Sequence, residues 1–336
     1  MRVLLTGGAG YIGSHTLLKL LQEQNEVLVL DNFSNSSMES LRRVKQLANR
    51  DFDFRNGDIC NSTLMNDTFN AFKPDAVIHF AGLKAVGESN DKPLDYYTHN
   101  VTGSVELLRC MRRHGCKQIV FSSSATVYGE ADYLPYDEQH PLRPTNPYGR
   151  TKYFVEEIIK DWTASWSEAS AVLLRYFNPV GAHDSGRIGE DPLSTPNNLV
   201  PFISQVAIGR LDKLNVFGSD YDTRDGTGER DYIHVDDLAR AHLSAVHFAS
   251  KNKACEAINV GTGRGATVLE MVKAFERASG RPIPLNMAAR RNGDVAKSIA
   301  DVSKANRLLD WEAIHNIDDM CRSTWNWQSL NPLGYK

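Results

Sequence analysis

The sequence predicts an α/β protein: a doubly wound parallel sheet with helices on both faces, followed by a smaller C-terminal lobe. Through the first half, short apolar segments alternate with longer amphipathic ones, which is the pattern of parallel strands joined by helices. A glycine-rich turn directly follows the first strand. The alternation ends after about Asn178, where we expect a second unit to begin. Because crossovers between parallel strands are right-handed, the sheet is wound in both directions from its centre.

The strands expected in the sheet are short, apolar and separated by helical segments. They are Arg2–Leu5, Val27–Leu30, Phe52–Arg55, Ala76–His79, Gln118–Phe121 and Ala171–Tyr176. The helices between them include Ile12–Gln24 and Val101–His114, where apolar residues recur at helical spacing.

The second half has a different composition. Residues 179–235 are rich in Pro, Gly, Asn and Asp, and helical patterns recur at about 236–250 and 267–280. We therefore expect residues 1–178 to form the main domain and residues 179–336 mainly a substrate-binding lobe. Segments near 235–260 should return to the main domain, with Ala257–Val260 as a further strand.

Composition excludes several classes of protein. A net charge of −3 over 336 residues gives no basic excess for nucleic-acid or membrane binding, and no apolar run reaches the roughly 18 residues of a membrane helix. The glycine turn begins too early to leave room for a signal peptide. Five cysteines without a C-x-x-C pair suggest neither a disulfide framework nor a zinc site, and the histidines show no ligand spacing. We expect a cytoplasmic protein without a metal.

The glycine turn predicts a dinucleotide site of the Rossmann type. Gly7, Gly10 and Gly13 are spaced three apart, with Tyr11 and Ile12 opening the helix that follows. Glycine allows the tight turn and the close approach of a pyrophosphate to a helix N-terminus. The second strand ends in Asp31, which can bind an adenosine ribose and would repel a 2′-phosphate. The sequence therefore favours NAD over NADP, the alternative being a purely structural turn.

Two further strand ends fit the same site. Asp58 follows the third strand, where a side chain can reach the adenine. Phe80, Ala81 and Lys84 follow the fourth strand, and the small residues there let a cofactor pass. Asp58 and Lys84 could otherwise be ordinary surface charges.

Tyr148 and Lys152 indicate oxidation of an alcohol. Four residues apart, they share one face of a helix that Pro147 can begin. A tyrosine pKa of about 10 is too high for a base at neutral pH, but the ammonium and a nicotinamide ring would both favour the phenolate. Of the three serines after the fifth strand, Ser124 is best placed to bridge the phenol and a substrate oxygen. The pair could also be a chance match, and the serines only a cap or turn.

These motifs resemble the extended short-chain dehydrogenase/reductases. More closely, they resemble the UDP-glucose 4-epimerase family and its relatives acting on N-acetylated sugars. The similarity runs nearly end to end and includes Thr6–His15, His79–Ser89, Leu174–Ala182, Pro196–Leu199 and Asp225–Val235. It implies that NAD takes a hydride from C4 of a UDP-hexose while Tyr148 removes the hydroxyl proton. Lys152 would tune Tyr148, and Ser124 would steady the 4-oxygen. The 4-keto sugar would turn over in the pocket, and the hydride would return to its other face.

The resemblance also implies the binding residues. Those for NAD are Gly7, Gly10, Tyr11, Ile12, Gly13, Asp31, Asn32, Asn35, Ser36, Asp58, Ile59, Phe80, Ala81, Lys84, His99, Tyr148, Lys152 and Phe177. Those for the UDP-sugar are Lys84, Ser124, Tyr148, Asn178, Asn198, Leu199, Phe217, Arg230, Arg291, Asp294 and Ser298. The arginines could instead pair with carboxylates such as Glu229 or Asp231. The family further implies a homodimer, formed through helices at about 90–113 and 150–167.

Two positions depart from the glucose-specific pattern of this family. His99 stands where an asparagine commonly contacts the cofactor. Ser298 stands where a tyrosine often walls the sugar pocket, so it should leave room for a 2-acetamido group. The alternatives are a strict UDP-glucose 4-epimerase, a nucleotide-sugar dehydratase or decarboxylase, and an NAD-sensing regulator. A dehydratase would need acidic groups just after Ser124, where Ala125 and Thr126 stand.

Overall fold

A seven-stranded parallel sheet forms the centre of the protein, which a computed structural model describes at residues 1–192, 198–291 and 294–336. Its strands, in the spatial order β10-β6-β5-β4-β1-β2-β3, are β1 (Arg2–Thr6), β2 (Glu26–Asp31), β3 (Asp53–Asn56), β4 (Ala76–His79), β5 (Gln118–Ser124), β6 (Ser170–Tyr176) and β10 (Cys255–Val260). The doubly wound sheet is thus confirmed, because the order runs outward in both directions from β1 and β4.

Two of the expected boundaries are wrong: the end of the fifth strand and the start of the helix expected at Val101–His114. Strand β5 continues through the serine run to Ser124, because Ser122 and Ser123 are buried and pair with β6. The serines are therefore part of the strand and not a turn after it. The expected helix Val101–His114 begins as a π-helix, η1 (Tyr97–Thr102), and only then becomes regular.

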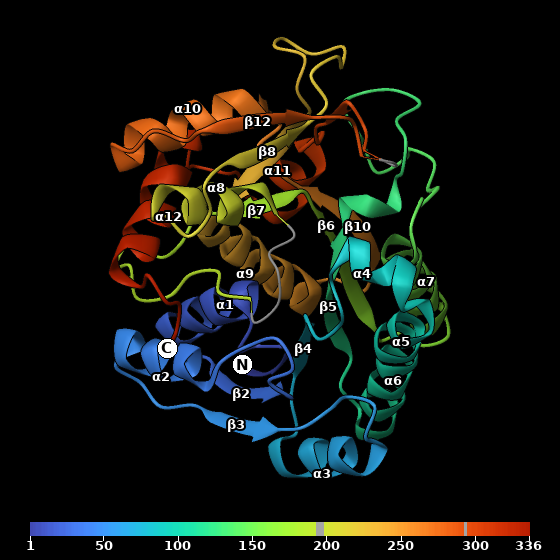
Figure 1. Cartoon of the computed structure of the whole chain (residues 1–336). Helices are drawn as coiled ribbons and strands as arrows, with labels where there is room; N and C mark the ends of the chain where they lie inside the picture. The colour runs from blue at the N-terminus through green and yellow to red at the C-terminus, as the bar shows by residue number, and fades with distance from the viewer. Residues whose placement is uncertain (193–197, 292–293) are drawn as a thin grey trace.

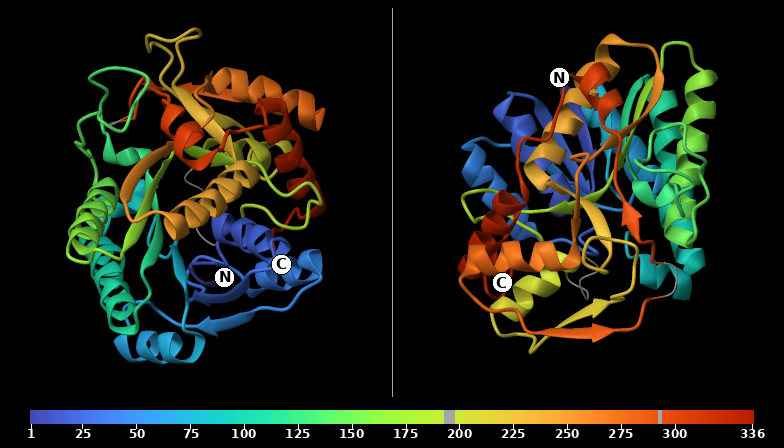
Figure 2. Two further views of the ribbon diagram at one scale, coloured as in Figure 1. Left: turned by 180° about the vertical axis from the view of Figure 1, so that it is seen from behind. Right: turned by 90° about the horizontal axis from the view of Figure 1, so that it is seen from above.

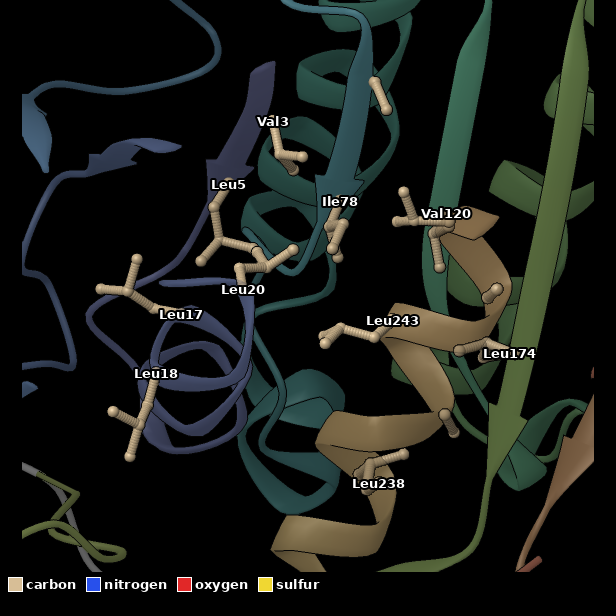
Figure 3. Close-up of a cluster of buried hydrophobic side chains, with 14 of the residues drawn as sticks. Val3, Leu5, Leu17, Leu18, Leu20, Ile78, Val120, Leu174, Leu238 and Leu243 are labelled. Carbon is tan, nitrogen blue, oxygen red and sulfur yellow. The ribbon is translucent and has the colours of Figure 1, made fainter. Parts of the chain in front are cut away.

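Helices cover both faces of the sheet (Figure 1). Alternate residues of β1 point to opposite faces, so Leu4 packs in one core and Val3 and Leu5 in the other. The second of these cores is drawn in Figure 3, where leucines of α1 (Tyr11–Gln22) and α9 (Val235–Lys251) pack against the strands. The helices of the main domain are α1 (Tyr11–Gln22), α2 (Met38–Ala48), α3 (Ser62–Phe72), α4 (Val86–Asp91), α5 (Pro93–Tyr96), α6 (Gly103–His114), the 3₁₀ turn η2 (Ala125–Val127) and α7 (Pro147–Ala164).

A second group of elements, mostly from the C-terminal half, lies against one end of this sheet (Figures 1 and 2). Its strands are β7 (Asn178–Val180), β8 (Leu214–Phe217), β9 (Glu229–His234), β11 (Gly265–Thr267), β12 (Leu285–Ala288) and β13 (Lys297–Ser298). Its helices are α8 (Leu199–Ala207), α10 (Val268–Ser279) and α12 (Ile317–Leu330), whereas α11 (Ser303–Leu309) packs against β10 in the core of the main sheet. Strand β9 is its organising element and pairs with β7, β11 and β13.

The chain returns to the main sheet between these elements. Helix α9 (Val235–Lys251) packs against β4, β5 and β6, and β10 pairs in parallel with β6. The division at residue 178 stays a prediction. All five cysteines are free thiols. Among the described residues, no helix has the length and apolarity that crossing a bilayer would require.

Candidate active site

The glycine turn between β1 and α1 is fixed by close backbone contacts. Gly7 has φ +72°, and a Cβ added there would lie 2.7 Å from the backbone nitrogen of Ala81. A Cβ added at Gly13 would lie 2.4 Å from the Gly7 carbonyl oxygen and would also be too close to the Gly8 backbone. Both positions therefore require glycine, and together they leave the N-terminus of α1 open to an anion.

Asp31, at the end of β2, holds the glycine turn in place through hydrogen bonds. Its Oδ2 accepts a hydrogen bond from the Ala9 backbone N–H at 2.9 Å. Its Oδ1 accepts from the Phe33 N–H at 2.9 Å and from the Ser36 hydroxyl at 2.8 Å. These bonds hold the carboxylate at the strand end, where it can also accept from a ribose hydroxyl.

A cavity of about 500 Å³ follows the carboxyl ends of β1, β2, β4 and β5. It is lined by nearly all of the residues expected to hold the cofactor: Gly7, Gly10, Tyr11, Ile12, Gly13, Asp31, Asn32, Asn35, Ser36, Asp58, Ile59, Phe80, Ala81, Lys84, His99, Tyr148 and Lys152. Phe177 is placed elsewhere, in a buried cluster with Tyr128 and Tyr136. Ser122 and Tyr176, which the sequence did not single out, also line the cavity and hydrogen-bond to each other at 2.8 Å.

Helix α7 carries Tyr148 and Lys152 into this cavity. It begins after Asn146, whose side chain accepts a hydrogen bond from the Gly149 N–H at 2.8 Å, with Pro147 in its first turn. Both functional side chains are buried. The Lys152 ammonium donates to the Ser122 carbonyl oxygen at 2.7 Å and lies 5.8 Å from the centre of the Tyr148 ring. Thr126 donates its N–H and hydroxyl to Ser124 Oγ, at 3.2 and 3.0 Å.

The expected ionisation of Tyr148 involves both the Lys152 ammonium and a nicotinamide ring, and the protein alone supplies only the first. Burial raises the pKa of Tyr148 well above its usual value, and only a hydrogen bond with Ser124 acts in the opposite direction. Burial also lowers the pKa of Lys152 to about 8, against the attraction of Glu156. The physical reason is desolvation, which penalises the charged form of each group. A further positive charge in the cavity would lower the pKa of Tyr148 and favour the phenolate.

A buried ion pair includes a residue of α7 one helical turn after Lys152, and the sequence analysis missed it. Arg175 Nη2 lies 2.6 Å from Glu156 Oε2, and both side chains are almost fully buried. The Ser123 hydroxyl also donates to Glu156. The available signal was the spacing, because Glu156 follows Lys152 by one helical turn on the same face. The ion pair joins α7 to β6, and the Ser123 hydroxyl joins Glu156 to β5, the strand that carries the serines.

A second cavity, of about 260 Å³, lies in the C-terminal lobe. Seven of the residues expected to bind the UDP group line it: Asn178, Asn198, Leu199, Phe217, Arg230, Arg291 and Asp294. Pro196 and Asn197 of the matching motif, and Gly293, lie outside the described residues.

The two arginines of this cavity are held differently. Arg230 donates to the backbone oxygen of Glu229 at 3.0 Å, whereas the Glu229 carboxylate pairs with Arg224. Arg291 pairs with Asp294 at 2.9 Å, and its guanidinium carbon lies 4.7 Å from the centre of the Phe217 ring. The suggested pairing of Arg230 with a neighbouring carboxylate is not what the structure shows, so this guanidinium is available to a phosphate.

Ser298 lies beside Arg230 in the lobe. Its Cα pairs with that of Arg230 between the parallel strands β13 and β9, and its side chain is half-buried. It contributes to the lining of neither cavity described above.

Comparison with known proteins agrees with this arrangement. Residues 4–324 match the family described as GDP-mannose 4,6 dehydratase. The UDP-glucose 4-epimerase of Dictyostelium discoideum is 53% identical over 99% of this chain and 97% of its own length. A crystal structure of UDP-glucose 4-epimerase from Bifidobacterium longum in complex with NAD⁺ and UDP has a TM-score of 0.96 and 48% identity, covering 99% of this chain and 100% of its own.

A more distant solved structure differs in its stated substrates. It is the UDP-Glc/GlcNAc 4-epimerase of Campylobacter jejuni, with a TM-score of 0.86 and 37% identity, covering 98% of this chain and 99% of its own. Identity above half over the whole chain, together with the glycine turn and the Tyr148–Lys152 pair, establishes the relationship. The protein belongs to the UDP-glucose 4-epimerase family of extended short-chain dehydrogenase/reductases.

Proposed function

We propose that the protein is an NAD-dependent UDP-hexose 4-epimerase that acts on both plain and N-acetylated sugars through a 4-keto intermediate. It would interconvert UDP-glucose with UDP-galactose, and UDP-N-acetylglucosamine with UDP-N-acetylgalactosamine. The observation that carries the proposal is the pair of cavities: one joins the glycine turn to Tyr148 and Lys152, and the other holds two arginines suited to a diphosphate.

The residues of the first cavity fit NAD. The open N-terminus of α1 would face the pyrophosphate, and Asp31 would accept from the adenosine ribose while disfavouring a 2′-phosphate. When bound, NAD supplies a reversible hydride acceptor and a positive ring. The positive charge of that ring would oppose the effect of burial, which raises the pKa of the Tyr148 phenol.

Proton transfer is assigned to Tyr148. Its phenolate takes the proton of the 4-hydroxyl as the C4–H bond gives up its hydride, which leaves a C4 carbonyl. Ser124 would hold the 4-oxygen, and Lys152, fixed by the Ser122 carbonyl, would keep positive charge 5.8 Å from the centre of the Tyr148 ring. After the sugar turns over, Tyr148 returns the proton to the same oxygen. Net redox change is zero, so NAD need not leave.

Acceptance of N-acetylated sugars rests on Ser298. The strand pairing sets Ser298 next to Arg230, which lines the second cavity and is proposed to bind the diphosphate, although Ser298 itself lines neither cavity. A small residue there leaves space for a 2-acetamido group without excluding the plain sugar. The Campylobacter jejuni relative, whose stated substrates include both sugar types, shares 37% identity with the chain.

A dehydratase is less well supported. Such a reaction removes water after oxidation at C4 and needs an acid near the base. The residues after Ser124 are Ala125 and Thr126, neither of which is acidic, and the Thr126 hydroxyl donates its hydrogen bond to Ser124. A regulator without catalysis would have no use for a buried tyrosine and lysine facing the cofactor.

We also propose a homodimer in the cytoplasm. Leu94 is 76% exposed and Phe154 is 41% exposed, although both are large apolar residues. They lie on α5 and α7, within the two helical regions that the family resemblance implies for the interface. The rings of Tyr97 and Phe154 stack with their centres 6.0 Å apart, which connects these two regions into one apolar surface.

The test is an assay of the purified protein, without added NAD, on the two plain and the two N-acetylated UDP-sugars. The proposal expects all four to be interconverted within their pairs, with NAD still bound to the protein afterwards. Activity on the plain pair alone would reduce the assignment to a strict UDP-glucose 4-epimerase. Formation of a dehydrated product, or no turnover by NAD-loaded protein, would overturn the epimerase assignment itself.

A further inference from the structure

We propose that Asp58, Cys60 and His99 form a Zn²⁺ site at the cofactor cavity, and that Zn²⁺ and the adenine end of NAD exclude each other there. The metal site rests on the arrangement of these three side chains alone. The exclusion also rests on the proposed function, because it assumes that Asp58 faces the adenine.

The three donors come from two segments that meet at the cavity. Asp58 and Cys60 lie in the turn between β3 and α3, and His99 lies on the π-helix η1. One ligand atom from each residue can be chosen so that all three lie within 4.8 Å of one another. Asp58 Oδ2 is 3.9 Å from His99 Nδ1, and the Cys60 N–H donates to Asp58 Oδ1 at 2.8 Å. Short π-helical segments are rare and often occur at functional sites.

The donor set favours Zn²⁺ in particular. One carboxylate oxygen, one thiolate sulfur and one imidazole nitrogen are all ordinary zinc ligands, whereas Ca²⁺ and Mg²⁺ prefer oxygen alone. At zinc bond lengths of about 2.0–2.3 Å, tetrahedral ligands lie roughly 3.5 Å apart. The three side chains would thus have to move together by only about 1 Å. Water would take the fourth position.

The surroundings support a cation. Asn32 donates its side-chain amide to Asp58 Oδ2 at 2.9 Å, which would orient the carboxylate and leave lone pairs for a metal. The side chains of Asp58 and His99 are 33% and 43% exposed, so an ion can reach them. On binding, the thiol proton passes to the buffer and sulfur becomes the anionic ligand.

Competition with NAD follows from shared residues. Asp58 and His99 both line the cavity of about 500 Å³ that the dinucleotide is proposed to occupy. A metal ion held by the Asp58 carboxylate takes the oxygens that would accept from the adenine amino group. Zn²⁺ should therefore bind the NAD-free protein and trap it, while the loaded enzyme is protected.

The test uses full-length protein with NAD bound and after its removal, with Co²⁺ as the spectroscopic probe and Zn²⁺ as its competitor. In the NAD-free protein we expect one Co²⁺ per chain, a thiolate-to-cobalt charge-transfer absorption, and its loss when Zn²⁺ is added. Cys60→Ser should abolish that absorption, and His99→Asn should weaken Zn²⁺ binding by about a hundredfold or more, since loss of an outer partner alone costs 10- to 100-fold. Cys255→Ser is the matched control and should change nothing. Adding NAD should remove the absorption.

An absorption that persists in Cys60→Ser, or NAD-free protein that binds no Co²⁺, would overturn the metal site. Recovery of activity on adding NAD shows that the NAD-free protein is folded. If it does not recover, the same titration is made on Asp31→Asn, which should be isolated with little NAD. Co²⁺ binding that NAD leaves unchanged would overturn the exclusion and move the adenine away from Asp58, whatever the epimerase assay shows.

Discussion

The two cavities are built on different principles. The cofactor cavity is made from backbone turns and strand ends of one parallel sheet, so that Gly7, Asp31 and Ala81 meet because the strands are neighbours. The UDP cavity is assembled from six separate stretches of the second half, from Asn178 at one end to Asp294 at the other. The first depends on regular geometry and burial. The second depends on side chains from short strands and helices that are far apart in the sequence.

Acid should destabilise both regions, because each holds buried histidines: His15, His79 and His242 on or against the main sheet, and His234 on β9 of the lobe. Burial lowers the pKa of His15 and His242 to about 4, and that of His79 to about 3. Between the unfolded pKa of about 6.5 and the lower folded pKa, these histidines bind protons in the unfolded chain but not in the folded one. Their contribution to the free energy of unfolding is therefore fully present above about pH 6.5 and is lost as the pH falls toward 4. We expect the free energy of unfolding, measured in urea, to fall by about 1.4 kcal/mol per pH unit for each such histidine.

His242→Gln checks this assignment. It should reduce the number of protons taken up on unfolding between about pH 6.5 and 4 by about one. Equal stability at pH 7 and 5 would show that these histidines are not neutral in the folded protein.

Tyr148→Phe should have the largest effect on catalysis. It removes the base without disturbing the packing of the ring, so we expect kcat to fall by at least about a hundredfold. NAD content should stay normal, because the glycine turn and Asp31 are intact. Tyr153→Phe on the same helix is the control. Near-normal turnover by NAD-loaded Tyr148→Phe would remove Tyr148 from the base position.

Asp31→Asn tests the cofactor side of the comparison. It keeps the shape of the side chain but removes the charge that accepts from Ala9, Phe33 and Ser36. Charged hydrogen bonds contribute about 1.5–3 kcal/mol, so NAD affinity should fall by about ten- to a hundredfold, and the preference over NADP should narrow. Dissociation constants for both dinucleotides measure this, with Asp53→Asn as an exposed control. An unchanged preference would place the ribose elsewhere.

Ser298→Tyr tests the substrate side and should have the smallest effect. A ring forced beside C2 costs typically about 1–3 kcal/mol, so activity on the N-acetylated pair should fall by about ten- to a hundredfold. Activity on the plain pair should be comparatively intact. Ser298→Ala keeps the space open and should retain both. Equal loss on both pairs in Ser298→Tyr would mean that Ser298 does not select at C2.

The cofactor cavity could be predicted from the sequence more fully than the UDP cavity. The sheet, the glycine turn and the strand-end residues could be predicted because their spacing is set by regular geometry, as at Gly7 and Asp31. The serine run was misplaced, since polar residues inside a buried strand look like a turn until their partners, Glu156 and Tyr176, are known. The UDP-binding residues came only from the family resemblance, because no local pattern relates Asn178 to Arg291. The ligand set of Asp58, Cys60 and His99 has no sequence spacing of its own and depends on the π-helix.

The central claim is that one bound NAD takes the C4 hydride and returns it to the same carbon. It is tested most directly with UDP-galactose carrying deuterium at C4, incubated with the enzyme in ordinary water and without added NAD. We predict that the deuterium remains on C4 of both UDP-glucose and UDP-galactose after many turnovers, because the hydride never leaves the closed site. Loss of deuterium to water, its appearance on another carbon, or turnover only with added NAD would contradict the account.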